Sequence, residues 1–360
     1  MGKPLFSIIF PTYGVEDYIR DAIEDIIYQS NRDWELIIVD DASPDHSGAI
    51  ADEYAKEESR IRVVHLHENG GVSNARNVGM DQAQGEYLLF LDPDDRFDTD
   101  LLDLLRYEIE RNHPQLIVYG LTEDFYGADG TIRASIPHYL GDCFCENKEQ
   151  LRRQLMPLEA ETLYGYPWNK AYQADFLRSS GARFPKIRLV EDILFNIEVF
   201  GKADTLSVLS CRPAHYRNIL HGERKSRLTG AEKSDYFSLQ KVRVEALIRQ
   251  QRSFSGEVKL SPEAKKVLAG EYFRSFSSWI SRQLRTGVSK KEIGKNARQE
   301  MQGEIYRLLK DDFVPAGRAA RFLIAPIPEG RIFRAIRRAA LVNRIRQLFP
   351  GLYARLKQQR

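Results

Sequence analysis

Two patterns of hydrophobic and polar positions follow each other in turn along the first 120 residues of the chain. Short apolar runs, typical of strands buried on both faces of a sheet, alternate with segments whose apolar residues recur at helical spacing. The expected strands are residues 5–10, 34–39, 62–66, 87–91 and 116–119, and the expected helices are residues 15–28, 47–56, 72–83 and 101–110. Strands that alternate with helices favour right-handed crossovers. The pattern therefore predicts a doubly wound, Rossmann-like α/β fold with a mostly parallel sheet.

The pattern becomes helical after the α/β part of the chain. The expected helices there are residues 236–250, 262–285, 293–309 and, after a stretch broken by proline and glycine, 331–349. We expect three regions, namely an α/β domain over residues 1–230, a helical extension over 231–313 and a basic amphipathic tail over 314–360.

Charge divides the chain more sharply than its net charge of +2 suggests. Residues 1–200 carry 19 Lys and Arg against 37 Asp and Glu, whereas residues 201–360 carry 34 against 14. Residues 318–360 hold 11 basic residues and one acid, Glu329, interleaved with apolar and aromatic residues. Such a segment is typical of a helix in the interface of an anionic membrane. The alternative is a helix that packs on the acidic half of the chain. Nucleic acid is not an expected partner, because residues 1–200 are strongly acidic.

Composition gives expectations about location. No run approaches the roughly 18 to 20 apolar residues that span a bilayer, and the first residues lead straight into a strand rather than a signal peptide. We expect a cytoplasmic protein, peripheral at the inner face of the plasma membrane. Three cysteines, Cys143, Cys145 and Cys211, are too few for a disulfide framework or a zinc site.

An acidic turn follows the fourth expected strand. Asp92, Asp94 and Asp95 come directly after the apolar run that ends at Leu91. Ligands bind at the carboxyl ends of strands in open α/β sheets, and paired carboxylates suit Mg²⁺ or Mn²⁺. We expect Asp92 and Asp94 to hold such an ion against a diphosphate. The alternative is a turn that caps the following helix.

Three other segments are expected on the same rim of the sheet. They are residues 11–13 (P-T-Y), residues 40–43 (D-D-A-S) and residues 69–77 (N-G-G-V-S-N-A-R-N). Alternatively, Asp41 and Ser43 cap the next helix and Gly70–Gly71 is a plain turn. The glycine fingerprint of dinucleotide-binding enzymes is absent after the first strand, so a hydride-transfer enzyme is not expected.

Together these motifs resemble the family 2 glycosyltransferases of the GT-A fold, of the kind that builds bacterial cell-surface polysaccharides. The resemblance covers roughly residues 5–230. The matching segments are residues 7–13, 39–43, 71–77, 91–95, 168–170 (W-N-K), 184–185 (F-P) and 190–195 (V-E-D-I-L-F). Gly14 departs from the asparagine common after the tyrosine.

The resemblance implies a role for each matching residue. It implies that the nucleotide-sugar is bound by Pro11, Thr12, Tyr13, Asp41, Arg76 and Asp92. Asp94 is the implied direct metal ligand, with Asp92 supporting it. Asp192 is the implied catalytic base, and Glu191 is expected to orient the acceptor or a loop.

Two further groups are expected to face the acceptor or the diphosphate. One interpretation places Trp168, Asn169 and Lys170 in the acceptor site, with Lys170 near phosphate. The alternative is that Trp168 belongs to the core, where tryptophan in this setting is typical. His215 and Arg217 begin a basic loop that continues through His221, Arg224, Lys225 and Ser226 and suits a diphosphate, although His215 is also a possible metal ligand.

These expectations amount to an inverting, metal-dependent enzyme that transfers a sugar from a nucleotide-diphosphate sugar, preferably a uridine one, to a glycan or lipid-linked saccharide. The Q-x-x-R-W signature of processive synthases is absent, which favours single addition. The alternatives are a module acting in teichoic-acid-type wall polymer synthesis and a non-catalytic binding module. A nucleotidyltransferase is disfavoured because no glycine-rich, lysine-bearing loop follows the first strand.

Overall fold

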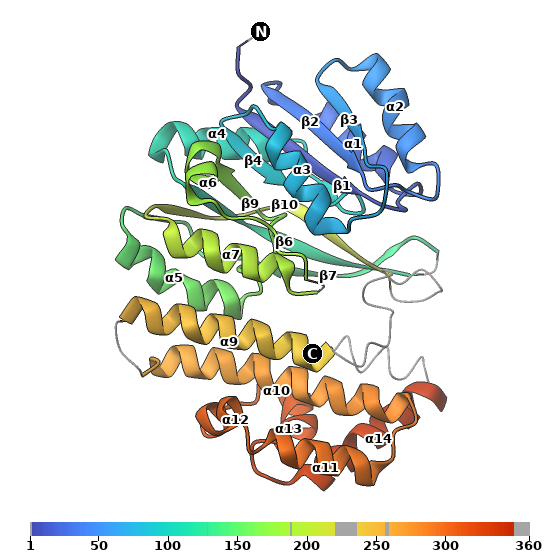
Figure 1. Cartoon of the computed structure of the whole chain (residues 1–360), viewed down its shortest axis with the longest axis vertical. Coiled ribbons are helices and arrows are strands. Elements are labelled where there is room, and N and C mark those ends of the chain that lie inside the picture. Colours follow the sequence, from blue (N-terminus) through green and yellow to red (C-terminus); the bar gives the residue numbers. More distant parts are fainter. Residues whose placement is uncertain (1, 128, 188, 220–235, 256–258, 349–360) are drawn as a thin grey trace. The chain divides into compact units, whose positions relative to one another are not determined.

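A computed structural model describes residues 2–127, 129–187, 189–219, 236–255 and 259–348 (Figure 1). The chain forms two compact units, residues 1–225 and 226–360. Each unit has its own core and is described by itself.

The first unit is built on one ten-stranded mixed sheet. The strands in spatial order are β3 (Ile61–His65), β2 (Trp34–Asp40), β1 (Phe6–Thr12), β4 (Tyr87–Phe90), β9 (Lys170–Gln173), β6 (Leu116–Tyr126), β10 (Leu206–Ile219) and β5 (Arg96–Phe97), with β7 (Ile132–His138) paired to β6 and β8 (Cys143–Cys145) paired to β10. The predicted α/β fold class is confirmed, and all five expected strands are present.

Parallel pairing in this sheet is interrupted by β9. Strands β3, β2, β1 and β4 are parallel neighbours, and β6 and β10 are also parallel. Between them β9 runs antiparallel to both β4 and β6, in a register that pairs Leu88 with Tyr172. Because β9 runs antiparallel to β4, its first residue, Lys170, lies beside the carboxyl end of β4.

The helices of the first unit cover this sheet. They are α1 (Ile19–Ile27), α2 (Ser47–Glu57), α3 (Val72–Gln82), α4 (Leu101–Asn112), α5 (Lys148–Ala160), α6 (Ala174–Ser180) and α7 (Glu191–Lys202). Helix α3 packs on β1 and β2. A β-carbon at Gly79 would clash with the Ile9 side chain, so the glycine permits this close approach. Arg76, about one turn earlier on α3, is thereby held over the sheet.

An aromatic cluster fixes α7 against the end of β4. Phe90 makes edge contacts with Phe184, Phe195 and Tyr172, and the rings of Phe184 and Phe195 stack with centroids 3.8 Å apart. Aromatic pairs of this kind add to the stabilisation from buried area. Asp192, one turn before Phe195, is therefore held close to the strand that leads into the acidic turn.

The second unit consists of helices. They are α9 (Tyr236–Ser255), α10 (Pro262–Arg285), α11 (Lys290–Glu300), α12 (Glu304–Leu309), α13 (Arg318–Leu323) and α14 (Ile332–Leu348), with α9 beside α10 and α11, α12 and α14 in contact with α10 (Figure 1). The single helix expected over residues 293–309 is divided in two. Helix α11 ends at Glu300, and extended backbone at Gly303, a poor helix former, stands at the N-cap position of α12.

Helix α14 is part of the core of this second unit. Ile332, Ala335, Ile336 and Ala339 are buried along one face of the helix. The apolar face of this part of the basic tail therefore packs within the helical unit itself, a placement that neither expectation had given. Across the described residues, no helix has both the length and the apolar character needed to cross a membrane.

Candidate active site

Three carboxylates meet in the turn after β4. One oxygen from each of Asp92, Asp94 and Asp95 lies within 4.8 Å of the others, and the turn is closed by a hydrogen bond from the Asp95 N–H to the Asp92 carbonyl. Helix α4 begins only at Leu101, with Asp100 at its N-cap position, so these acids precede the helix instead of capping it. Three hard oxygen donors at this spacing fit a divalent cation.

The three acids differ in their surroundings. Desolvation raises the pKa of Asp94 to about 6, and the charge of Asp92 adds to the rise. Asp95 is buried, and its Oδ1 accepts a hydrogen bond of 3.0 Å from the backbone N–H of Arg217. Asp95 therefore ties β10 to the acidic turn, while the exposed Asp94 remains accessible.

Arg76 joins the acidic turn to the start of α7. Its Nη2 donates to Asp92 Oδ1 at 2.9 Å, and its Nη1 donates to Asp192 Oδ1 at 2.5 Å. Arg76 as a whole residue is 2% exposed. Burial opposes its charge, but Asp192 and Asp92 outweigh that effect and raise the pKa of Arg76. Three residues predicted to act together thus lie in one chain of charge-assisted hydrogen bonds.

Asp192 lies in the first turn of α7. Burial raises its pKa to about 7, with Glu191 and Asp92 adding to the rise and Arg76 opposing it. Burial also raises the pKa of Glu191, whose Oε2 is buried without a hydrogen-bond partner in the described part of the chain. Perturbed carboxylates in one place are typical of functional sites.

The loop before α3 is braced by Asp41. The two oxygens of its buried carboxylate accept hydrogen bonds of 2.8 Å from the backbone N–H groups of Gly70 and Gly71. The left-handed φ of 85° at Gly71 requires a glycine there. Asp41 therefore does not cap α2, and Gly70–Gly71 is an anchored turn. Each oxygen of Asp41 keeps a lone pair, so a contact with a nucleotide base stays a prediction.

The segment after β1 gives its three residues different access to solvent. Thr12 is fully buried, and its hydroxyl donates to the Phe10 carbonyl. Pro11 is half-buried, whereas Tyr13 is exposed. Among the three, Tyr13 is the residue whose side chain suits contact with a ligand.

Asn169 and Lys170 have contacts that do not support the predicted role at the acceptor or diphosphate. Lys170 is fully buried, and its ammonium donates to the carbonyls of Leu163 and Tyr166 and to Asn169 Oδ1, at 2.5–2.8 Å. These bonds use all three ammonium protons. Burial also lowers the pKa of Lys170 well below its usual value. Trp168 is buried as well, as the core alternative anticipated.

The predicted basic loop is described by the structure only at His215 and Arg217. His215 Nδ1 lies 2.9 Å from Asp124 Oδ2 and its Nε2 lies 3.3 Å from Asp98 Oδ1, so these contacts do not direct it to the acidic turn. The Arg217 side chain pairs with Asp21 at 3.1 Å. His221, Arg224, Lys225 and Ser226 lie outside the described residues.

Two motifs that are far apart in sequence interlock beside the site. The Asn77 side chain accepts from the Phe184 N–H at 3.0 Å and donates to the Phe184 carbonyl at 2.9 Å. Ser73 donates to the Pro185 carbonyl at 2.8 Å. Sequence reasoning missed Asn196, which is fully buried on α7 and holds the loop before β9. The signal available in the sequence was an asparagine between two apolar residues, Phe195 and Ile197.

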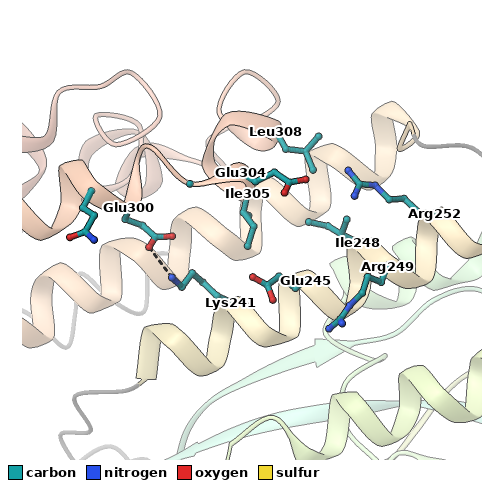
Figure 2. A pocket seen from close by; sticks show the side chains of 11 residues that line it. Lys241, Glu245, Ile248, Arg249, Arg252, Glu300, Glu304, Ile305 and Leu308 are labelled. Atoms are coloured by element: carbon teal, nitrogen blue, oxygen red, sulfur yellow. Dashed lines mark hydrogen bonds and ion pairs between the residues drawn. The ribbon is translucent and has the colours of Figure 1, made fainter.

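A pocket of about 460 Å³ lies elsewhere, in the helical unit (Figure 2). Helix α9 and the α11–α12 segment line it. Its charged residues are three basic ones, Lys241, Arg249 and Arg252, and three acidic ones, Glu245, Glu300 and Glu304, with Lys241 and Glu300 paired at 2.8 Å. This balance does not favour a diphosphate, so the acidic turn remains the candidate site.

A known protein family matches most of the α/β unit. Residues 7–178 match the family model described as Glycosyl transferase family 2. Residues 7–178 thus belong to glycosyltransferase family 2.

Curated relatives include the uncharacterized glycosyltransferase EpsJ of Bacillus subtilis, 35% identical over 57% of this chain and 59% of EpsJ. The putative teichuronic acid biosynthesis glycosyltransferase TuaG of the same organism is 45% identical over 31% of this chain and 44% of TuaG. The chain thus spans about half the length of these curated relatives.

Among solved structures, residues 1–349 of Staphylococcus aureus TarS in complex with UDP-GlcNAc align with a TM-score of 0.64. The alignment covers 94% of this chain and 91% of that one, at 20% identity. At this identity the match supports the fold alone.

Replacing Arg76 tests the charge bridge. We expect Arg76→Met to lower the free energy of unfolding by about 3–5 kcal/mol at pH 8, because Asp92 and Asp192 lose their buried partner. Arg76 favours the charged form of Asp192, so its contribution exists above the pKa of that carboxyl, about 7, and fades as the pH falls to 5. Chemical denaturation at both pH values measures the difference.

Arg20→Met is the matched control, because Arg20 pairs with Glu53 on the surface at 2.8 Å. Exposed pairs contribute about 0–1 kcal/mol. An Arg76→Met effect no larger than the control would show that the bridge is not a major stabilising contact. A larger effect that is independent of pH would show that Arg76 does not act through the charge of Asp192.

Proposed function

We propose that the chain transfers a sugar from a nucleotide-diphosphate sugar to a hydroxyl group of a cell-surface glycan or lipid-linked saccharide. The observation that carries the proposal is the bridge formed by Arg76. It joins a carboxylate with a pKa of about 7, Asp192, to a turn of carboxylates that suits a divalent cation. A general base and a diphosphate site are the two parts that glycosyl transfer requires.

Asp192 serves as the base in this proposal. Arg76 holds its Oδ1, which leaves Oδ2 to accept the proton of the attacking hydroxyl. A base with a pKa near neutrality combines a useful unprotonated fraction with a good driving force for proton transfer. Attack from the base side and departure of the diphosphate on the opposite side invert the anomeric carbon. The product leaves after one addition.

Asp94 and Asp92 are the residues that would hold Mn²⁺ or Mg²⁺. The carboxylates fit such an ion because their oxygens converge and because burial and the charge of Asp92 disfavour the charged form of Asp94 without a cation. When bound, the ion offsets the negative charge that develops on the diphosphate. Tyr13, Asp41 and Arg76 complete the proposed nucleotide-sugar side of the site.

The names of similar proteins support a uridine nucleotide and a wall polymer or polysaccharide acceptor. One TarS structure contains UDP-GlcNAc, and TarS itself is named a poly(ribitol-phosphate) β-N-acetylglucosaminyltransferase. TuaG is named for teichuronic acid biosynthesis. A module of teichoic-acid-type synthesis is therefore one form of the proposal. A non-catalytic module is disfavoured, because Arg76, Asp192 and the three acids are all in place.

We also propose that the protein contacts anionic membrane through the exposed face of α14. Arg334, Arg337, Leu341, Arg344 and Leu348 are exposed at helical spacing along that face. In the part of the chain that the structure describes, none of these arginines is paired with a carboxylate. Arginines interleaved with exposed leucines suit an anionic lipid surface. Such contact would place the enzyme near a lipid-linked acceptor at the inner face of the membrane.

The central test is replacement of the proposed base. We expect Asp192→Asn to lower kcat about 10²- to 10⁴-fold in an assay of nucleotide release from a panel of UDP-sugars with saccharide acceptors. In the unmodified protein kcat/KM should rise with pH through about 7, since the base must be unprotonated. Asp175→Asn, at an exposed carboxylate on α6, is the control. Normal turnover of Asp192→Asn would disprove the assignment.

Metal binding has a readout that does not depend on activity. We expect Mn²⁺ to raise the thermal unfolding midpoint, with a stabilisation of about 2.7 kcal/mol at a hundredfold excess over Kd. Protons compete with the ion at Asp94, so the stabilisation should be full above pH 6 and fade below it. Asp94→Asn should largely abolish it, whereas Asp175→Asn should not. Equal stabilisation of both variants would rule out the site.

Membrane contact is tested by charge reversal. We expect Arg334→Glu, Arg337→Glu and Arg344→Glu together to weaken binding to phosphatidylglycerol vesicles at least about 100-fold, since each basic residue contributes about 1 kcal/mol. Reversal of three exposed basic residues of the first unit, Lys56, Arg106 and Arg111, gives the same change in net charge. Equal losses in both variants would show that only net charge matters.

A further inference from the structure

The loop before β9 is held rigidly yet exposes one large side chain. Within residues 163–170, Gly165 is half-buried and Tyr166 alone is exposed, with 43% of its surface accessible. The other six residues of this segment are buried. An exposed aromatic ring on an otherwise buried loop is a feature that packing alone does not explain.

Two buried polar side chains anchor this loop. Lys170 donates to the carbonyls of Leu163 and Tyr166, and Asn196 donates to those of Tyr164 and Gly165 at 3.1 and 3.0 Å. Burying a charged ammonium is costly unless it is fully hydrogen-bonded. The fold accepts that cost here, and the result is a fixed backbone at Tyr166.

The ring of Tyr166 is also fixed, because it belongs to a stack of three aromatic rings. It stacks on Trp168 at 5.3 Å between centroids with 27° between planes, and Trp168 stacks on Tyr216 at 5.8 Å and 14°. Tyr216 precedes Arg217, whose N–H binds Asp95 in the acidic turn. The stack therefore extends from the neighbourhood of the acidic turn to the surface.

The same loop is linked to the proposed base. Asn196 and Asp192 are four residues apart on α7, which places them on one face of the helix. The loop also lies at the correct edge of the sheet, because β9 is antiparallel to β4 and starts where β4 ends. Tyr166 is thus positioned by the two elements that position Asp192 and the acidic turn.

The sheet order separates Tyr166 from the proposed nucleotide residues. Tyr13 and Asp41 follow β1 and β2, on one side of β4, whereas Tyr166 and Tyr216 belong to the β9 and β10 side. The acidic turn lies between these groups. A ligand on the Tyr166 side is therefore the partner of the nucleotide-sugar and not the nucleotide itself.

We propose that the exposed face of Tyr166 is a platform on which a sugar ring of the acceptor stacks. The inference rests on the proposed function and identifies its acceptor subsite. The C–H face of a pyranose is flat and weakly apolar, and it complements a fixed aromatic face. The platform is uncharged, so it suits a neutral sugar ring. The buried Trp168 supports Tyr166 from behind.

Saturation-transfer NMR with Mg²⁺ and UDP present tests this platform. The probes are methyl β-D-glucopyranoside and methyl N-acetyl-β-D-glucosaminide, titrated into the unmodified protein, Tyr166→Ala and Tyr166→Phe. We expect Tyr166→Ala to raise the Kd of a bound glycoside about three- to tenfold, the range of a lost aromatic stack. Tyr166→Phe should bind like the unmodified protein, because it keeps the ring. Tyr107→Ala, at an exposed tyrosine on α4, is the matched control.

The Kd of UDP separates failure of the platform from failure of the proposed function. Unchanged UDP binding in every variant, with glycoside binding lost only in Tyr166→Ala, supports the platform. Glycoside binding that is absent from the unmodified protein or unaffected by Tyr166→Ala overturns it. A loss of UDP affinity in Tyr166→Ala also overturns it, since the ring would then serve the nucleotide. Absence of UDP binding in the unmodified protein contradicts the proposed function itself.

Discussion

The buried guanidinium of Arg76 is the contact on which the candidate site depends. It lies on α3, and its two hydrogen bonds reach the turn after β4 and the first turn of α7. These three segments are far apart in the sequence, and no other described side chain binds both carboxylates. Without Arg76, Asp92 and Asp192 would face each other as partly buried like charges. The bridge therefore both holds the elements together and sets the charge of the site.

Arg76 does not neutralise the site. Five carboxylates, Asp92, Asp94, Asp95, Glu191 and Asp192, lie around one buried arginine and the nearby Arg217. Burial raises the pKa values of Asp94, Asp95, Glu191 and Asp192. An excess of desolvated negative charge is stable only if protons or a cation reduce it. A cation at the proposed metal site would offset this excess.

The local pattern of apolar residues predicted the strands and helices well. The contacts of individual site residues were predicted less well, because they join segments that are far apart in the sequence. The five strands and the helices of residues 1–120 follow from apolar periodicity, and α10 has the expected bounds. The bonds of Asp41 to Gly70 and Gly71 were not foreseen, because they depend on how two strand ends meet. Lys170 was expected near phosphate, because its sequence motif does not reveal that Asn169 and the preceding loop bind its ammonium group. Neither fact is encoded in the spacing of a motif.

The position of β9 explains why the site forms beside β4. Ligands bind in open α/β sheets where the strand order changes direction, because neighbouring loops diverge there. In this chain the change is completed by an antiparallel strand, which brings the loop before β9 to the same edge as the turn after β4. A parallel strand in that place would present its own carboxyl end to the rim, with the loop that follows it. The inserted strand instead delivers the loop that carries Tyr166, so both sides of the acidic turn receive residues suited to different ligands.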